Sequence, residues 1–118
     1  MATIDKYEYN IPAYQQGNVA DFEFSFGVNF PVADVSEISF QVRKSQGKLK
    51  ELMMDEKTIA NGGILLSSDG FDVTVLFSKE DMDLYGTFYY EIDVLNLTGD
   101  PFATIGGSFT VLKETNDK

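Results

Sequence analysis

The segment DFEFSFGVNF, residues 21–30, alternates apolar and polar side chains along its length. Successive side chains of a β-strand point to opposite faces of its sheet, so this alternation predicts a strand with one buried face. The same pattern returns in three further segments: EISFQVRK at 37–44, GFDVTVLFS at 70–78 and TFYYEIDVL at 87–95. Because β-branched and aromatic residues dominate all four, we expect an all-β chain.

Weaker patterns predict additional strands. KYEYNIPAY at 6–14, KLKELMM at 48–54 and GSFTVLK at 107–113 alternate in part, and GILL at 63–66 is a short apolar run. Pro12 lacks a backbone N–H, so the first of these segments is expected at a sheet edge or a bulge. Glycine-containing turn sequences separate the segments, at 45–47, 61–63, 68–70 and 98–101. This spacing is typical of a sandwich or a barrel.

The composition restricts the chemistry. The chain has no cysteine and no histidine, so disulfides, thiolate metal sites and the usual serine or cysteine triads are excluded. Histidine is also the common general base at neutral pH. We therefore expect a protein that is not an enzyme and has no cofactor.

The charge restricts the partners. Nineteen acidic residues against nine basic ones give a net charge of −10, which argues against binding nucleic acid or an anionic membrane. The start of the chain, MATIDKYEYN, lacks the features of a signal peptide. With 118 residues, the sequence is expected to form one domain, residues 1–118, with an ordered core over about 4–113.

The segment SKEDMDL, residues 78–84, matches a capping pattern, in which the Ser78 hydroxyl accepts a hydrogen bond from the backbone three residues on. It predicts one helical turn with Leu84 pointing inward and with Glu80, Asp81 and Asp83 in solvent. A calcium loop over the same acids is less favoured. Tyr85 occupies the place of a third oxygen ligand, and the twelfth position is an isoleucine.

Glu91 and Asp93 are predicted on the outward face of one strand, at a separation that glycosidase carboxylates also adopt. A domain of this size leaves little room for a catalytic cleft, so a solvated acidic face is favoured. Tyr89, on the same face, is suited to stacking on a sugar ring or on a partner surface.

Candidate interface residues come from two patterns. VRKSQGKLKE at 42–51 gathers four basic residues around one hairpin, whereas residues 69–118 hold three basic and ten acidic residues. Lysines there either protect an exposed edge or dock onto an acidic surface, including another copy of the chain. Five apolar residues also fall out of phase with the inward faces: Met53, Met54, Leu76, Leu95 and Leu112. The candidate interface is Arg43, Lys44, Lys48, Lys50, Tyr89 and Leu95.

The order of these elements resembles the immunoglobulin-like domains of tailed-phage tail and baseplate structural proteins, in particular the N-terminal domain of baseplate upper proteins. The residues that carry the resemblance are IPAYQQGNVADFEFSF, ISFQVRKSQGKL, GFDVTVLFSKEDMDLYGTFYYEIDV and GSFTV. The chain departs from antibody domains, because Phe88 stands where the tyrosine corner needs a tyrosine, and Tyr90 stands in place of the second cysteine.

The resemblance implies an antiparallel, immunoglobulin-like β-sandwich of about seven or eight strands, with one helical turn near residues 78–84. It implies a non-enzymatic structural protein of a phage or prophage tail or baseplate, made in the bacterial cytoplasm and located in the virion. Its partners would be other phage structural proteins or further copies of itself. The alternative is a carbohydrate-binding or adhesin module that uses Tyr85, Tyr89 and the neighbouring acids.

Overall fold

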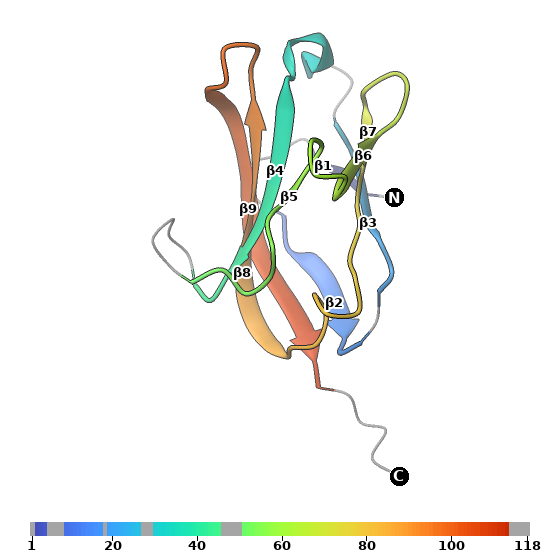
Figure 1. The fold of residues 1–118 in the computed structure, drawn as a ribbon, viewed down its shortest axis with the longest axis vertical. Coiled ribbons are helices and arrows are strands. Elements are labelled where there is room, and N and C mark those ends of the chain that lie inside the picture. The colour runs from blue at the N-terminus through green and yellow to red at the C-terminus, as the bar shows by residue number, and fades with distance from the viewer. Residues whose placement is uncertain (1, 5–8, 18, 27–29, 46–50, 114–118) are drawn as a thin grey trace.

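In the computed structural model, the chain forms two β-sheets packed face to face (Figure 1). The structure describes residues 2–4, 9–17, 19–26, 30–45 and 51–113. The four-stranded sheet has the order β1 (Ala2–Ile4), β3 (Phe22–Phe26), β7 (Asp72–Val75), β6 (Ile64–Leu66). The five-stranded sheet has the order β2 (Ile11–Gln15), β9 (Pro101–Leu112), β8 (Gly86–Leu95), β4 (Glu37–Arg43), β5 (Lys57–Thr58). A single-turn 3-10 helix, η1 (Val32–Asp34), precedes β4.

The strand order is that of an immunoglobulin-like sandwich, so the predicted fold class is confirmed. The sheet β1-β3-β7-β6 corresponds to strands A, B, E and D, and β9-β8-β4 corresponds to G, F and C, with β5 added beside C. The pairings are mainly antiparallel, but β1 pairs with β3 and β2 pairs with β9 in parallel. The alternation could not predict this, since it specifies faces and not strand directions.

The predicted strands differ in their outcome. The four strongly alternating segments all contain a strand, and GILL forms β6. The expectation for Pro12 is confirmed, because β2 is an edge strand whose register with β9 shifts between Ile11 and Tyr14. The strand predicted at 48–54 is wrong over its described part, where Leu52 forms only an isolated bridge with Arg43. Residues 48–50 lie outside the described residues.

The core consists of aromatic and β-branched side chains from the inward faces of both sheets. Phe24 on β3, Phe40 on β4, Tyr90 on β8 and Phe109 on β9 are all fully buried. Phe40 stacks on Tyr90 at 5.7 Å between ring centroids and meets Phe109 edge to face at 6.3 Å. Aromatic pairs in these arrangements stabilise a fold beyond the area that they bury. The alternation predicted from the sequence thus becomes an interlocked aromatic interior.

Tyr90 adds a directional contact to this interior. Its hydroxyl donates a hydrogen bond of 2.6 Å to the backbone carbonyl of Tyr9, which directly precedes the β2 region. Burial, helped by the nearby Tyr9 and Tyr89, raises the pKa of Tyr90 above its usual value, so the hydroxyl keeps its proton and remains a donor. A buried carbonyl without a partner would be costly, and Tyr90 removes that cost.

We predict that Tyr90→Phe lowers the free energy of unfolding by about 1–2 kcal/mol, because the Tyr9 carbonyl loses its donor while the ring packing is kept. Tyr85→Phe is the matched control, since Tyr85 is 54% exposed and its variant should stay within about 0.5 kcal/mol of the parent. Urea denaturation measures both values. Equal stability of the two variants would contradict the structural role of the Tyr90 hydroxyl.

The 78–84 segment forms a hydrogen-bonded turn. The predicted cap is confirmed and is reciprocal: the backbone N–H of Asp81 donates to the Ser78 hydroxyl at 3.1 Å, and the N–H of Ser78 donates to the Asp81 carboxylate at 2.8 Å. The segment does not continue into a regular helix. The fully buried side chain is Met82, while Leu84 is only partly buried. The inward position predicted for Leu84 therefore belongs chiefly to Met82.

Asp81 corrects a second expectation. It was expected in solvent, but it is buried and forms an ion pair with Lys57 at 2.5 Å. Burial alone would raise the pKa of Asp81, but the hydrogen bonds from Lys57 and Ser78 outweigh that cost and hold the pKa below its usual value. The charged form of Asp81 is therefore stabilised by folding. Lys57 lies on β5, so the ion pair ties the edge of one sheet to the turn that follows the other.

We predict that Asp81→Asn destabilises the protein by about 1.5–3 kcal/mol at pH 7, because Lys57 loses its charged partner. The stabilisation by ionised Asp81 is present above the unfolded pKa of about 3.9 and is lost as the pH falls through the lower folded value. The difference between parent and variant should therefore shrink below about pH 4. Thermal unfolding across pH measures it, with the exposed Glu80→Gln as control. A difference that stays constant down to pH 2 would contradict the assignment.

The five out-of-phase apolar residues behave differently from one another. Met54 is buried in the core, Met53 packs against it, and Leu76 and Leu95 are partly buried. Leu112, at the end of β9, is 56% exposed. Met53 and Met54 therefore contribute to the core, Leu95 marks a shift of register between β8 and β9, and Leu112 faces outward.

Candidate docking surface

The outward face of the five-stranded sheet brings two of the predicted interface residues together. Arg43 on β4 lies directly opposite Tyr89 on β8 in the antiparallel register, and Lys44 follows Arg43 at the exposed end of the strand. We name Arg43, Tyr89 and the exposed Lys44, which is next to Arg43 in sequence, the basic-aromatic patch. Lys48 and Lys50 lie outside the described residues. Leu95 is on the same strand as Tyr89 but six positions further on, about 20 Å away, so it does not belong to this patch.

Tyr89 is held in place by a glycine on the neighbouring strand. A β-carbon added at Gly106 on β9 would meet the Tyr89 hydroxyl oxygen and would lie 2.9 Å from Tyr89 Cζ. The ring therefore lies across the strand at Gly106, and only a residue without a side chain leaves room for it. Tyr89 is partly buried as a result. The hydroxyl end of its ring is thus used for packing within the molecule.

Arg43 is anchored by a row of polar side chains. Its Nη2 donates to the Gln41 Oε1 at 2.6 Å, and the Gln41 Nε2 donates to the Ser39 hydroxyl at 2.8 Å. The Ser39 hydroxyl in turn donates to the Glu56 carboxylate. Ser39 and Gln41 are buried although they point away from the core. This row holds the guanidinium end of the Arg43 side chain, which lowers the entropy that Arg43 would lose on binding a partner.

The acids on the same face are not all solvated. Asp93 is only 7% exposed and accepts a hydrogen bond of 2.9 Å from the Thr104 hydroxyl on the neighbouring strand. The expectation of a solvated pair is therefore wrong for Asp93, while Glu91 is partly exposed. Within the described residues, no group of three or more acidic side chains is placed to hold a metal ion. The hydrogen bond from Thr104 gives Asp93 a structural role.

Tyr85, proposed from sequence for the alternative sugar-binding function, is exposed but has a neighbour. The Lys113 ammonium lies over the Tyr85 ring, 5.4 Å from its centroid. This distance is within the range of a cation–π contact. The hydroxyl end of Tyr89 packs over Gly106, so both tyrosines make contacts inside the molecule.

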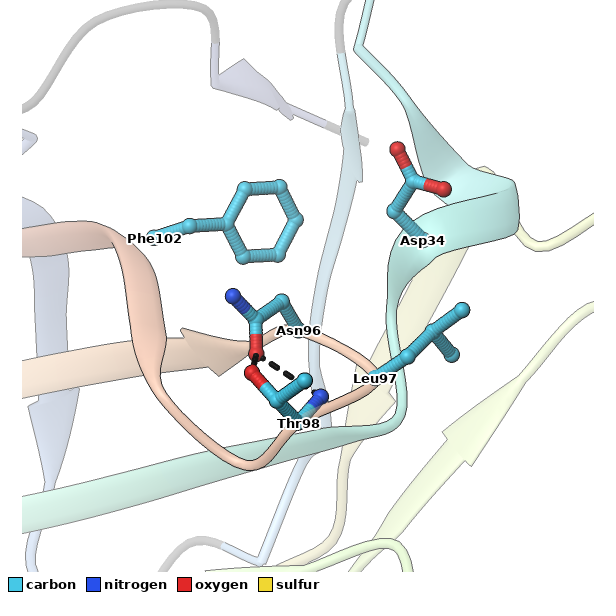
Figure 2. Close-up of a pocket in the computed structure, with 5 residues that line it drawn as sticks. All are labelled: Asp34, Asn96, Leu97, Thr98 and Phe102. Carbon is cyan, nitrogen blue, oxygen red and sulfur yellow. Dashed lines mark hydrogen bonds between the residues drawn. The ribbon is translucent and has the colours of Figure 1, made fainter.

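A shallow hollow of about 320 Å³ lies at the end of the sandwich where η1 meets the β8–β9 turn (Figure 2). Its apolar lining is Leu97, which is 69% exposed, and Phe102. The Asn96 side-chain oxygen accepts hydrogen bonds from the backbone N–H of Thr98 at 3.0 Å and from the Thr98 hydroxyl at 2.7 Å. These bonds stabilise the turn itself. Sequence reasoning did not single out this hollow, because its lining comes from η1, the β8–β9 turn and the start of β9.

Comparison with models of protein families finds no match, and comparison with curated proteins also finds none. Among solved structures, the chain is similar to CD84, described in terms of SLAM family function, with a TM-score of 0.38 and 13% identity. The similarity covers 97% of this chain and 99% of that chain. No helix in the described part of the chain has the length and apolar character needed to cross a membrane. The observed strand order defines the class of this protein as an immunoglobulin-like β-sandwich.

We predict that Gly106→Ala destabilises the protein by about 1–2 kcal/mol, because the new methyl group displaces the Tyr89 ring. The cost should fall in a Tyr89→Ala background, where the ring is absent, and a double-mutant cycle by urea denaturation measures this coupling. Gly107→Ala is the contrasting control. Its methyl group would meet the backbone carbonyl of Tyr9, so Tyr89→Ala should not rescue it. Strict additivity at Gly106 would contradict the described position of Tyr89.

Proposed function

We propose that this protein is a non-enzymatic structural component of a phage or prophage tail or baseplate and acts by docking onto other proteins of the particle. Its sequence resembles the immunoglobulin-like domains of such proteins over most of its length. The observation that carries the docking role is the basic-aromatic patch of Arg43, Lys44 and Tyr89. Arginine and tyrosine are enriched in interfaces, and both side chains are held in place here before any partner binds.

The charge of the chain supports the choice of partner surface. Although the net charge of the protein is −10, Arg43 and Lys44 are adjacent cations in sequence and are suited to an acidic surface on a partner. The sugar-binding alternative has less support, because the Lys113 ammonium lies over the Tyr85 ring and the hydroxyl end of Tyr89 packs over Gly106. A sugar platform needs ring faces open to solvent.

The first test is location. Mass spectrometry of purified particles from the phage or prophage that encodes the chain should detect its peptides in the tail fraction. Their absence from intact particles would overturn the proposal. A glycan array tests the alternative, where saturable binding that is lost in Tyr89→Ala would favour a carbohydrate-binding module.

The second test addresses the patch. We predict that Lys44→Glu weakens association with the particle protein that the parent captures, by about tenfold, because a rim cation facing an acidic surface becomes repulsive. Lys79→Glu makes the same change of charge at another exposed lysine and should leave the affinity nearly unchanged. Surface plasmon resonance with the captured protein measures both variants. Equal losses would assign the effect to net charge and not to the patch.

A further inference from the structure

The edge strands of the two sheets differ in how they are protected against pairing with another chain. β2 carries Pro12 and a register shift, and β5 is two residues long and contains Lys57. β1 is followed directly in sequence by Asp5 and Lys6. Prolines, bulges and charges are the usual protections of exposed edges. β6 is also short, with three residues, but it has no proline, bulge or charge, and no charged residue occurs anywhere from 58 to 68.

The hydrogen bonds of β6 show which of its backbone groups face the open edge. The Leu76 N–H donates to the Gly63 carbonyl, and the Ser67 N–H donates to the Asp72 carbonyl, both at 2.9 Å. In an antiparallel ladder, successive residues alternate between bonding to the partner strand and pointing away from it. Leu65, opposite Thr74, is therefore in phase with Gly63 and Ser67. Ile64 and Leu66 direct their backbone groups outward.

The side chains of β6 are also incompletely covered. Leu65 is 52% exposed and Leu66 is 37% exposed, whereas Ile64 is buried. Two adjacent leucines on an edge strand expose apolar surface beside outward-facing backbone donors and acceptors. This combination is the requirement for strand addition, in which the backbone supplies hydrogen bonds and alternate side chains supply fit.

We propose that β6 is a self-association site, at which two copies of this chain pair their β6 strands antiparallel about a two-fold axis through Leu65. In that register Ile64 of one copy lies opposite Leu66 of the other, and each exchanges both of its outward backbone hydrogen bonds. Leu65 meets Leu65 of the second copy at a non-hydrogen-bonded position, where side chains approach closely. The two four-stranded sheets then become one continuous sheet.

The strand that pairs with β6 belongs to a second copy of the chain for two reasons. The edge is complementary to itself, and the sequence around it carries no charge. Two molecules that each carry a charge of −10 repel one another over most orientations. The uncharged stretch around β6 permits the backbones to approach without opposing like charges. The role of this pairing in assembly rests on the proposed function. A dimer paired at β6 would present the basic-aromatic patch twice.

Sedimentation velocity across a concentration series tests the pairing. The parent should shift from monomer toward dimer between about 10 μM and about 1 mM, the range expected of a small interface. Leu65→Lys should abolish the shift, because it places two lysines face to face on the axis. Leu112→Lys changes an equally exposed leucine on the other sheet and should dimerise like the parent. A parent that stays monomeric, or a Leu65→Lys variant that still dimerises, would overturn the proposal.

Amide hydrogen exchange on the parent avoids reliance on a variant that fails to fold. Protection of the Ile64 and Leu66 amides should rise with protein concentration, whereas the Leu65 amide, which faces β7, should be protected at every concentration. Protection that does not depend on concentration would overturn the pairing. A monomer that is nevertheless found in purified tails would reject the β6 site and leave the proposed function standing. A β6 dimer that is absent from particles would support the β6 site and reject the proposed function.

Discussion

The fold depends on the contact between Phe40 and Tyr90 at the centre of the sandwich. In immunoglobulin domains that contain cysteine, a disulfide between strands B and F joins the sheets at this level. This chain has no cysteine. Phe40 instead stacks on Tyr90 within the five-stranded sheet and meets Phe77, which follows β7 of the other sheet, edge to face at 5.8 Å. The Tyr90 hydroxyl then extends the contact to the backbone of Tyr9. A covalent link is thus replaced by dense packing and one buried hydrogen bond, which are independent of the redox state of the surroundings.

Polar side chains organise the periphery around that centre. The Glu37 carboxylate accepts hydrogen bonds from the backbone N–H groups of Ile59 at 2.7 Å and Ala60 at 3.2 Å. Lys57 from the same crossing segment pairs with Asp81. These contacts hold residues 57–60, the start of the passage from the five-stranded sheet to β6. Acids that sequence analysis assigned to solvation are therefore partly structural.

The sequence predicted what depends on local pattern. Alternation located the four main strands and the inward Phe40 and Tyr90, and the cap at Ser78 was predictable because its partners are three residues apart. Features that depend on contacts between distant segments were missed: the parallel pairing of β2 with β9, the burial of Asp93 under Thr104 and the ion pair of Asp81 with Lys57. For the candidate site, the pattern placed Arg43 and Tyr89 on outward faces but could not place them opposite one another.

The parallel pairing of β2 with β9 has a consequence for how the molecule is made. The Asn10 side chain accepts a hydrogen bond from the Ser108 backbone across 98 positions of sequence, and Ile11 pairs with Phe109. A ribosome releases the first of these residues long before it has produced the second. β2 therefore cannot form its hydrogen bonds until β9 has been synthesised. Completion of the five-stranded sheet is a late event of biosynthesis, as expected of topologies rich in distant contacts.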